Sequence, residues 1–487
     1  MYQGLPLLSI IVFTQIIASP IAYLAAFKSK KLGNMVTVLA SLIPFIVTLS
    51  LFWEIYGGAI LFESYRWITT IGLNFDFQLD SLSYPFTLLI SLMGFLAAIY
   101  STKYMEGENG YEAYLALLLL FNSGMLGVVL ASNFFLFYIF WELMLVPSYF
   151  LIAYWGTGRP RIIGFKYFIF THAGALSLLL GIVWIYGVFG TLEFSKLAEL
   201  AGRMPLTHEI LIISVLIFVG AAVKMAVFPF HTWLPDAHAE APTPISVLLS
   251  GVMIKTGVYA IARILIGFFP STLPIMLPAL ALLAVITMVW GGLMALVQTD
   301  VKRLLAYSSV SQMGYILFGL ITLAPIGVAG GLFHVLNHGF AKGMLFMGAG
   351  VLIHELHERD LRKLGGLASK MPLTAVAMLV GGLSIAGTPP LGGFASEWMI
   401  FGGGMDAGLT LYTAIAIATT AITAAYYLRM VRAVFFLKPK MSLQNVRDAP
   451  VSMAAPMAAL LFLVIILGFL NYPITKMIAQ AVSGILP

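Results

Sequence analysis

Residues 224–244 of the chain carry the feature that decides its fold, and they read Lys224-Met-Ala-Val-Phe-Pro-Phe-His-Thr-Trp-Leu-Pro-Asp-Ala-His-Ala-Glu-Ala-Pro-Thr-Pro244. The stretch overlaps the end of an apolar run at 209–228, so Lys224 lies inside that run. Proline removes a backbone N–H donor and clashes with the preceding helical turn. The stretch therefore predicts a helix that is interrupted beside a buried lysine.

The composition around this stretch is that of a membrane protein. Of the 487 residues, 61% are hydrophobic and 9% charged, whereas about 25% are charged in an ordinary soluble domain. The mean hydropathy is +0.99, and apolar runs of about 20 residues recur along the whole chain. These values exclude a soluble enzyme, a disordered chain and a secreted disulfide scaffold. The absence of cysteine excludes iron–sulfur clusters, thiolate zinc sites, catalytic thiols and disulfides within this chain.

The apolar runs predict an all-α, polytopic fold of about fourteen transmembrane helices. They lie at 4–26, 33–53, 82–100, 113–131, 133–153, 163–190, 209–228, 244–264, 272–297, 304–325, 326–353, 373–402, 408–437 and 452–470. Alternate loops of this arrangement hold most of the basic residues, for example Lys28, Arg159, Lys302, Arg359 and Arg447. The positive-inside rule then places the chain in the cytoplasmic membrane with both termini on the non-cytoplasmic side. This rule also accounts for the net charge of +6, so we expect no nucleic-acid partner.

Ionisable side chains lie inside several of these apolar runs. A charge at the centre of a membrane costs about 2.5–3.5 kcal/mol on insertion scales, so such residues usually face a polar interior and mark an ion or proton path. For any one residue, snorkelling from a helix end or a static ion pair remains an alternative. A proton relay explains the set better, and its members are Glu142, Lys224, Lys255, His334, His338, Lys342 and Glu397.

Three of these residues are spaced for one helix face. His334, His338 and Lys342 follow one another at i, i+4 and i+8, which places them in line over about 12 Å. A neutral imidazole both donates and accepts a hydrogen bond, which suits proton transfer. A haem or zinc site is less favoured because no other span supplies an obvious set of ligands. We expect no metal and no cofactor in this chain.

A second interruption is expected in the other half of the chain, at Gly387-Thr-Pro-Pro-Leu-Gly-Gly-Phe394, just before Glu397. An interrupted membrane helix is tolerated where its freed backbone faces protein or water. Paired interruptions in two halves of a chain are typical of inverted repeats with an ion site between them. Counting spans makes the broken helices the seventh and the twelfth. The predicted units are N-terminal helices 1–3 (1–110), two inverted five-helix repeats (111–265 and 270–437) and a C-terminal helix (438–487).

The same segments resemble a known family, the antiporter-like membrane subunits of respiratory complex I and its relatives. These relatives include Mrp-type antiporters, membrane-bound hydrogenases, sulfane sulfur reductases and F420H2 dehydrogenases. The resemblance extends over most of the chain, and the long block after Lys224 is its most specific part. The matching stretches are Trp141-Glu-Leu-Met-Leu-Val-Pro147, Lys224 through His238 to Lys255-Thr-Gly-Val-Tyr259, Asp300-Val-Lys-Arg-Leu-Leu-Ala-Tyr-Ser-Ser-Val-Ser-Gln-Met-Gly314, His334 to Lys342, and Gly387 to Glu397.

The resemblance implies roles for individual residues. Glu142 matches the glutamate that pairs with the helix-seven lysine, here Lys224. Lys255 matches the lysine or histidine of the central relay on helix eight. His334 and His338 match relay positions on helix eleven. Many members carry lysine at the position of Glu397, whereas the M-type subunit of complex I carries glutamate, so the resemblance favours the M type.

The resemblance also implies the surroundings of the chain. We expect other membrane subunits, including further antiporter-like ones, together with peripheral redox subunits that carry iron–sulfur clusters and flavin or a nickel–iron centre. The transported ion is expected to be H⁺ and possibly Na⁺. The chain itself would perform no redox chemistry, so any oxidoreductase activity belongs to the complex. The alternative is a subunit of a multisubunit Na⁺/H⁺ antiporter of the Mrp type, which has no redox partner.

Overall fold

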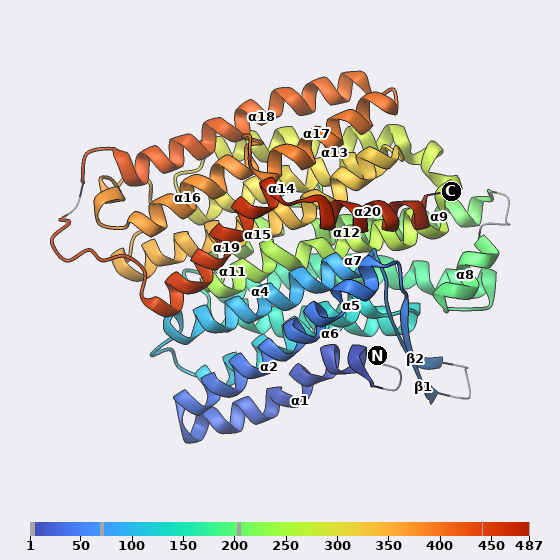
Figure 1. The fold of residues 1–487 in the computed structure, drawn as a ribbon, viewed down its shortest axis with the longest axis horizontal. Coiled ribbons are helices and arrows are strands. Elements are labelled where there is room, and N and C mark those ends of the chain that lie inside the picture. The colour runs from blue at the N-terminus through green and yellow to red at the C-terminus, as the bar shows by residue number, and fades with distance from the viewer. Residues whose placement is uncertain (1–4, 69–72, 202–205, 441, 487) are drawn as a thin grey trace.

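The computed structural model describes residues 5–68, 73–201, 206–440 and 442–486, and it is a bundle of long, roughly parallel and antiparallel helices (Figure 1). Within these residues, twelve helices are long and apolar enough to cross a membrane. The helices of the first half are α1 (Leu7–Lys28), α2 (Lys30–Ser50), α3 (Phe52–Tyr56), α4 (Ser83–Tyr104), α5 (Tyr111–Leu130), α6 (Phe134–Trp155), α7 (Pro160–Phe189), α8 (Phe194–Ala201), α9 (His208–Met225) and α10 (Trp233–Glu240).

The second half continues the bundle. Its helices are α11 (Thr243–Leu248), η2 (Leu249–Met253), α12 (Ile254–Ala260), η3 (Ile261–Ile266), η4 (Pro270–Thr272), α13 (Leu273–Val297), α14 (Val301–Ile321), α15 (Pro325–Leu356), η5 (Leu367–Ser369), α16 (Pro372–Ile385), α17 (Gly392–Asp406), α18 (Thr410–Val431), η6 (Arg432–Phe436), α19 (Val451–Phe469) and α20 (Tyr472–Ile485). All fourteen predicted spans coincide with helices, although residue 4 of the first span lies outside the described residues. The predicted spans at 326–353 and 373–402 are not among the twelve apolar helices; they correspond to α15 and to the pair α16 and α17.

Both predicted interruptions are present. The first separates α9 from α10, and the second separates α16 from α17. At the first break, Trp233 Nε1 donates to the carbonyl oxygen of Val223 and Phe228 N donates to Thr287 Oγ1, each at 3.0 Å. Side chains thus bind backbone groups that a continuous helix would have paired, as a membrane interior requires. The inverted relation of the two five-helix units stays a prediction.

Helix α15 forms the centre of the bundle. Every residue from Gly327 to Leu352 is buried, and α15 packs on α14, α16, α17 and α19. A helix that is buried on all sides can carry polar residues only if they face other protein groups. His334, His338 and Lys342 lie on this helix and are therefore shielded from lipid.

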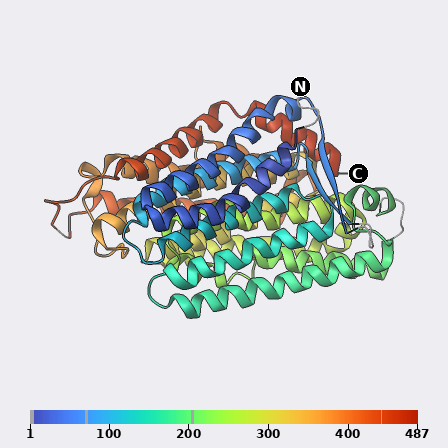
Figure 2. The same ribbon diagram turned by 90° about the horizontal axis from the view of Figure 1, so that it is seen from below.

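Several elements were not predicted from the sequence. Strands β1 (Leu61–Ile68) and β2 (Leu73–Leu79) form an antiparallel hairpin beside the start of α1. Figure 2 shows the hairpin at the same end of the bundle as the beginning of α1 and the end of α20. Helix α20 is amphipathic rather than apolar throughout, and it buries one face, which includes Met477, Ala481 and Ile485. A search for continuous apolar runs finds neither kind of element.

A largely buried ion pair lies just after this hairpin, at the start of α4. Arg263 Nη2 lies 2.7 Å from Asp80 Oδ1, and both side chains are largely buried. Burial raises the pKa of Asp80, but the charge and hydrogen bond of Arg263 lower it more, so the pKa of this carboxyl stays well below its usual value. Asp80 Oδ1 also accepts the backbone N–H groups of Leu82 and Ser83 at the start of α4. One carboxylate therefore caps a helix and connects it to η3.

The structure corrects the predicted position of Lys302. The sequence analysis counted this residue among the charged loops, but it lies in the first turn of α14 and is 3% exposed. The helix begins earlier than the apolar run because Asp300 Oδ1 accepts the N–H groups of Lys302 and Arg303, at 2.8 and 3.1 Å. Lys302 Nζ donates to the carbonyl oxygen of Ala241, at the end of α10.

Candidate functional site

The first half of the candidate site is formed by α6, α7 and α9. Glu142 Oε2 lies 3.4 Å from Nδ1 of His172, and both side chains are partly exposed. Because His172 is in the middle of α7, this exposure is toward the side of the bundle. Lys224 is buried in the last turn of α9. Its Nζ lies 5.1 Å from the centre of the Trp141 ring and has no hydrogen-bond partner among the described residues.

The expected ion pair between Glu142 and Lys224 is not formed in this structure. Among the described residues, Glu142 pairs with His172 instead. Lys224 is stabilised by the face of the Trp141 ring, a cation–π contact that is worth more when it is shielded from water. Glu142 follows Trp141 on α6, so the carboxylate and the ring that contacts Lys224 belong to successive residues of one helix. The structure thus does not contain the predicted ion pair, and the switching of this pair stays a prediction.

The second half of the site begins at Lys255. This residue is 1% exposed on α12, between the π-helical turns η2 and η3. Its Nζ lies 2.7 Å from Nδ1 of His338 and also donates to the carbonyl oxygen of Ser250. A π-helical turn shifts the backbone hydrogen-bond pattern, and such turns are frequent at functional sites. Lys255 on α12 and His338 on α15 are therefore in direct contact at the centre of the bundle.

From His338 the polar line continues to the second break. The rings of His338 and His334 are 6.2 Å apart, centre to centre. His334 Nδ1 lies 2.9 Å from Ser396 Oγ, and its Nε2 lies 2.6 Å from Oε1 of Gln312. Ser396 precedes Glu397 on α17. Glu397 is 3% exposed, and its Oε1 has no hydrogen-bond partner among the described residues.

Glu397 lies against the break itself. A Cβ atom at Gly387 would come within 2.2 Å of Glu397 Oε2, so a larger residue there would displace the carboxylate. Gly387 also has a φ of +65°, a conformation that other residues adopt at a cost. The glycine at the end of α16 therefore creates the space that Glu397 occupies.

Lys342 lies on a branch of this line. Its Nζ donates to the carbonyl oxygen of Leu305 at 2.7 Å and lies 5.5 Å from the centre of the Tyr427 ring. It does not bind His338 directly, although it is one helical turn away on the same face of α15. The structure thus brings Lys255, His338 and His334 into one line that ends at Ser396, the residue before Glu397. It places Glu142 and Lys224 in a second group, and Lys342 beside the line.

Some residues of this arrangement were missed in the sequence analysis. His172 is a histidine within the apolar run at 163–190, the same signal that identified His334 and His338. Gln312 and Ser396 are neutral polar residues within apolar spans, and the search considered ionisable groups and histidines alone. Among the described residues, no group of three or more His, Asp or Glu side chains is placed to hold a metal ion.

Comparisons with known proteins place the chain among similar sequences. Residues 131–423 match the family model of the NADH:quinone oxidoreductase/Mrp antiporter transmembrane region, and residues 67–115 match the N-terminus of NADH-ubiquinone oxidoreductase (complex I) chain 5. The chain is 32% identical to NADH-quinone oxidoreductase subunit M of Rickettsia felis, over 99% of both chains. It is also 32% identical to F(420)H(2) dehydrogenase subunit M of Methanosarcina mazei, over 97% of this chain and 96% of that one.

A solved structure with the same fold is the membrane-bound sulfane sulfur reductase, an archaeal respiratory membrane complex. One of its chains superposes with a TM-score of 0.89 and 29% identity, and the match covers 98% of this chain and 97% of that chain. The chain therefore has relatives that match nearly its full length in sequence and in fold. The chain belongs to the family of antiporter-like transmembrane subunits found in complex I-type NADH:quinone oxidoreductases and Mrp antiporters.

Proposed function

We propose that this chain is a proton-translocating M-type subunit of a complex I-type redox assembly. Protons move from Lys224 to Lys255, through His338 and His334, and leave through Glu397. The observation that carries this proposal is the buried line between Lys255 and the second break, in which Lys255 contacts His338 at 2.7 Å and His334 contacts Ser396 at 2.9 Å. The imidazole and hydroxyl groups of this line both accept and donate hydrogen bonds, which a static ion pair would not need.

Glu142 controls the first step in this proposal. At an effective dielectric constant of 20, two opposite charges attract by about 4 kcal/mol at 4 Å and by about half of that at 8 Å. Moving Glu142 from His172 to Lys224 therefore stabilises the ammonium charge by about 2 kcal/mol. One charge crossing the membrane changes in energy by about 2.3 kcal/mol per 100 mV. The pair is thus strong enough to hold or release a proton against the membrane potential.

The surroundings follow from the same geometry. A partly exposed Glu142–His172 pair in the middle of two membrane helices is costly in contact with lipid, so we infer that another membrane subunit covers this side. Helix α1 begins, and helix α20 ends, at the same end of the bundle (Figure 1). The basic loops lie at the other end, so we place both termini on the non-cytoplasmic side of the cytoplasmic membrane.

Proton translocation in membrane vesicles tests the relay. The intact assembly is compared with Lys224→Ala, with Glu397→Ala and with Glu397→Lys, and the amount of assembled complex is measured for each. We expect Lys224→Ala and Glu397→Ala to lose translocation by about tenfold or more. Glu397→Lys keeps an ionisable group at the exit, so it should retain most of the activity. Full translocation in both alanine variants would overturn the relay.

The identity of the partner subunits tests the redox part separately. The native assembly is purified in a mild detergent and its subunits are identified by mass spectrometry. Subunits that carry iron–sulfur clusters with flavin or nickel would place the chain in a redox complex, and they would identify the electron donor. Membrane subunits alone, together with Na⁺-dependent H⁺ movement in vesicles, would favour the Na⁺/H⁺ antiporter and overturn the redox assignment.

A further inference from the structure

A cavity of about 450 Å³ lies at the basic end of α18, outside the relay. It is lined by Ala425, Leu428, Arg429, Arg432, Ala433 and Leu437. Figure 1 shows α18 along one side of the bundle, and η6 follows it in the chain. None of the lining residues belongs to the proposed proton path, so what the cavity holds is independent of the proposed function.

The two arginines of this cavity have no acidic partner. Among the described residues, neither Arg429 nor Arg432 comes within ion-pair distance of a carboxylate. Arg429 donates one bond to the carbonyl oxygen of Gln298, but its Nε is buried and has no partner in the same part of the chain. A buried donor without an acceptor costs about 1–3 kcal/mol, more for a charged group. The cavity therefore offers two positive charges without a counter-ion among its lining residues.

The residues that line the cavity change from apolar to basic along α18 and into the turn η6 that follows it. Ala425, Leu428 and Arg432 follow one another at i, i+3 and i+7, so they lie on one face of the helix. The distance along the axis from Ala425 to Arg432 is about 10 Å. Apolar side chains thus lie nearer the middle of the membrane, and the two guanidinium groups lie at its edge. Arginine binds phosphate oxygens through paired N–H groups, which a single ammonium group cannot do.

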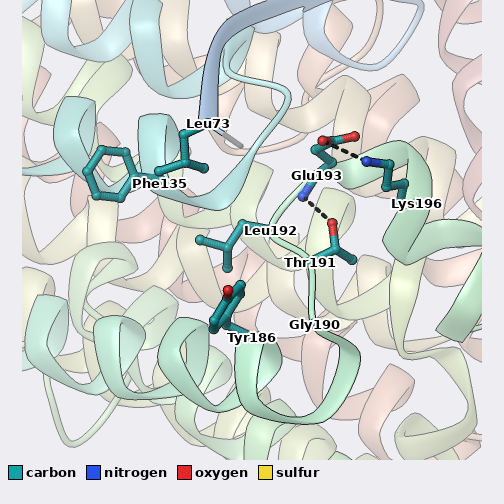
Figure 3. Close-up of a pocket in the computed structure, with 8 residues that line it drawn as sticks. All are labelled: Leu73, Phe135, Tyr186, Gly190, Thr191, Leu192, Glu193 and Lys196. Carbon is teal, nitrogen blue, oxygen red and sulfur yellow. Dashed lines mark hydrogen bonds and ion pairs between the residues drawn. The ribbon is translucent and has the colours of Figure 1, made fainter. Parts of the chain in front are cut away.

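A second cavity provides a contrast. It measures about 460 Å³ and lies near the hairpin, with Leu73, Phe135, Tyr186, Gly190, Thr191, Leu192, Glu193 and Lys196 around it (Figure 3). Its one cation, Lys196, lies 2.9 Å from Oε1 of Glu193. The charge is neutralised within the cavity wall, so this site has no preference for an anion. The cavity at α18 differs in having two cations and no internal counter-ion.

We propose that the cavity at α18 is a binding site for an anionic phospholipid. The phosphate binds Arg429 and Arg432, and an acyl chain follows Ala425 and Leu428 toward the middle of the membrane. A lipid explains both features of the site, because a free phosphate would need the arginines alone and a zwitterionic lipid would bring a cation close to them. Each basic residue near a membrane surface contributes about 1 kcal/mol to the binding of anionic lipid.

Lipid binding to the full chain tests this proposal. The chain is freed of lipid in a neutral detergent, and binding is followed by native mass spectrometry with phosphatidylglycerol, with phosphatidylcholine of the same chain length, and with inorganic phosphate. We expect phosphatidylglycerol to bind about tenfold more tightly than phosphatidylcholine. Arg429→Gln together with Arg432→Gln should remove this preference. Lys28→Gln with Lys31→Gln changes the net charge equally at the same end of the bundle and should keep it.

Two further measurements separate a lipid from other occupants. Ala425→Trp fills the apolar part of the cavity and leaves both arginines, so it should weaken phosphatidylglycerol binding about tenfold. The single variant Arg432→Gln alters an exposed side chain and keeps the test valid if the double variant folds poorly. Equal affinity for the two lipids would overturn the proposal. It would also be overturned if inorganic phosphate displaced phosphatidylglycerol equally well from the unchanged chain and from Ala425→Trp, or if the native assembly retained no anionic lipid.

Discussion

The two halves of the buried polar line are built differently. In the second half, Lys255 Nζ contacts His338 Nδ1 and His334 Nδ1 contacts Ser396 Oγ at hydrogen-bond distance, and the two imidazole rings lie 6.2 Å apart, centre to centre. Around Glu142 and Lys224, the ammonium group has no hydrogen-bond partner among the described residues, and the carboxylate pairs with His172. A contact that already exists transfers a proton without rearrangement, whereas a gap has to be closed first. We therefore propose that the first half contains the switch and the second half conducts.

The largest effect is expected from breaking the second half. Lys255→Ala removes the contact with His338, and a hydrogen bond to a charged group is worth about 1.5–3 kcal/mol, so translocation should fall about tenfold to a hundredfold. The measurement is proton uptake by vesicles that contain equal amounts of the assembly. Lys103→Ala is the matched control, because Lys103 is exposed and pairs with Glu106 alone. Normal uptake by the Lys255 variant would show that protons do not pass through this contact.

The next prediction distinguishes between the observed partner of Glu142, His172, and its predicted partner, Lys224. Glu142→Gln removes the charge that stabilises Lys224, so translocation should fall about thirtyfold, the equivalent of the roughly 2 kcal/mol estimated for the pair. His172→Asn removes the competing partner and leaves the carboxylate free to approach Lys224, so the loss should be only about threefold. Glu106→Gln makes the same chemical change at an exposed site and serves as the control.

The outcome of this pair of variants decides where the switch lies. If His172→Asn reduces translocation as strongly as Glu142→Gln, the histidine itself carries the proton and the first half begins at α7. If neither variant has an effect, the pair is structural and the first half contains no switch. Translocation rates measured at several membrane potentials sharpen the test. A switch of about 2 kcal/mol should no longer affect the rate once the membrane potential opposes proton movement by more than this amount.

The sequence predicted the conducting half better than the switching half, for a physical reason. Apolar runs, Gly/Pro interruptions and ionisable residues within them reflect the cost of placing polar groups in lipid, so they reveal α15, both breaks and the buried residues. They do not reveal which partner a side chain selects. Glu142 lies on α6, and the choice between His172 on α7 and Lys224 on α9 depends on how three helices pack.

Elements whose pattern is not apolar throughout were missed for a related reason. Leu73-Asn-Phe-Asp-Phe-Gln-Leu79 alternates apolar and polar residues, which is the period of a half-buried strand, but it lies between apolar runs that dominate a search for spans. Lys302 was counted among exposed charges because its helix begins at the Asp300 cap, ahead of the apolar residues. In both cases local hydrogen bonding, and not hydropathy, determines the structure.

The smallest effect is expected from a neutral side chain. Ser396→Ala removes the hydroxyl that contacts His334 Nδ1 at 2.9 Å, next to the exit residue Glu397. A neutral hydrogen bond is worth about 1 kcal/mol, so translocation should fall about fivefold, and Ser396→Thr should restore most of it. Ser148→Ala is the matched control, because Ser148 is buried and bonds to Tyr167 at 2.7 Å without belonging to the line. If both alanine variants lose activity equally, the loss reports packing and the conducting half does not depend on this hydroxyl. A loss for Ser396→Ala without a loss for Ser148→Ala would place a neutral hydroxyl in the proton path. This hydroxyl would then connect His334 to Glu397, which the ionisable residues of the line do not do by themselves.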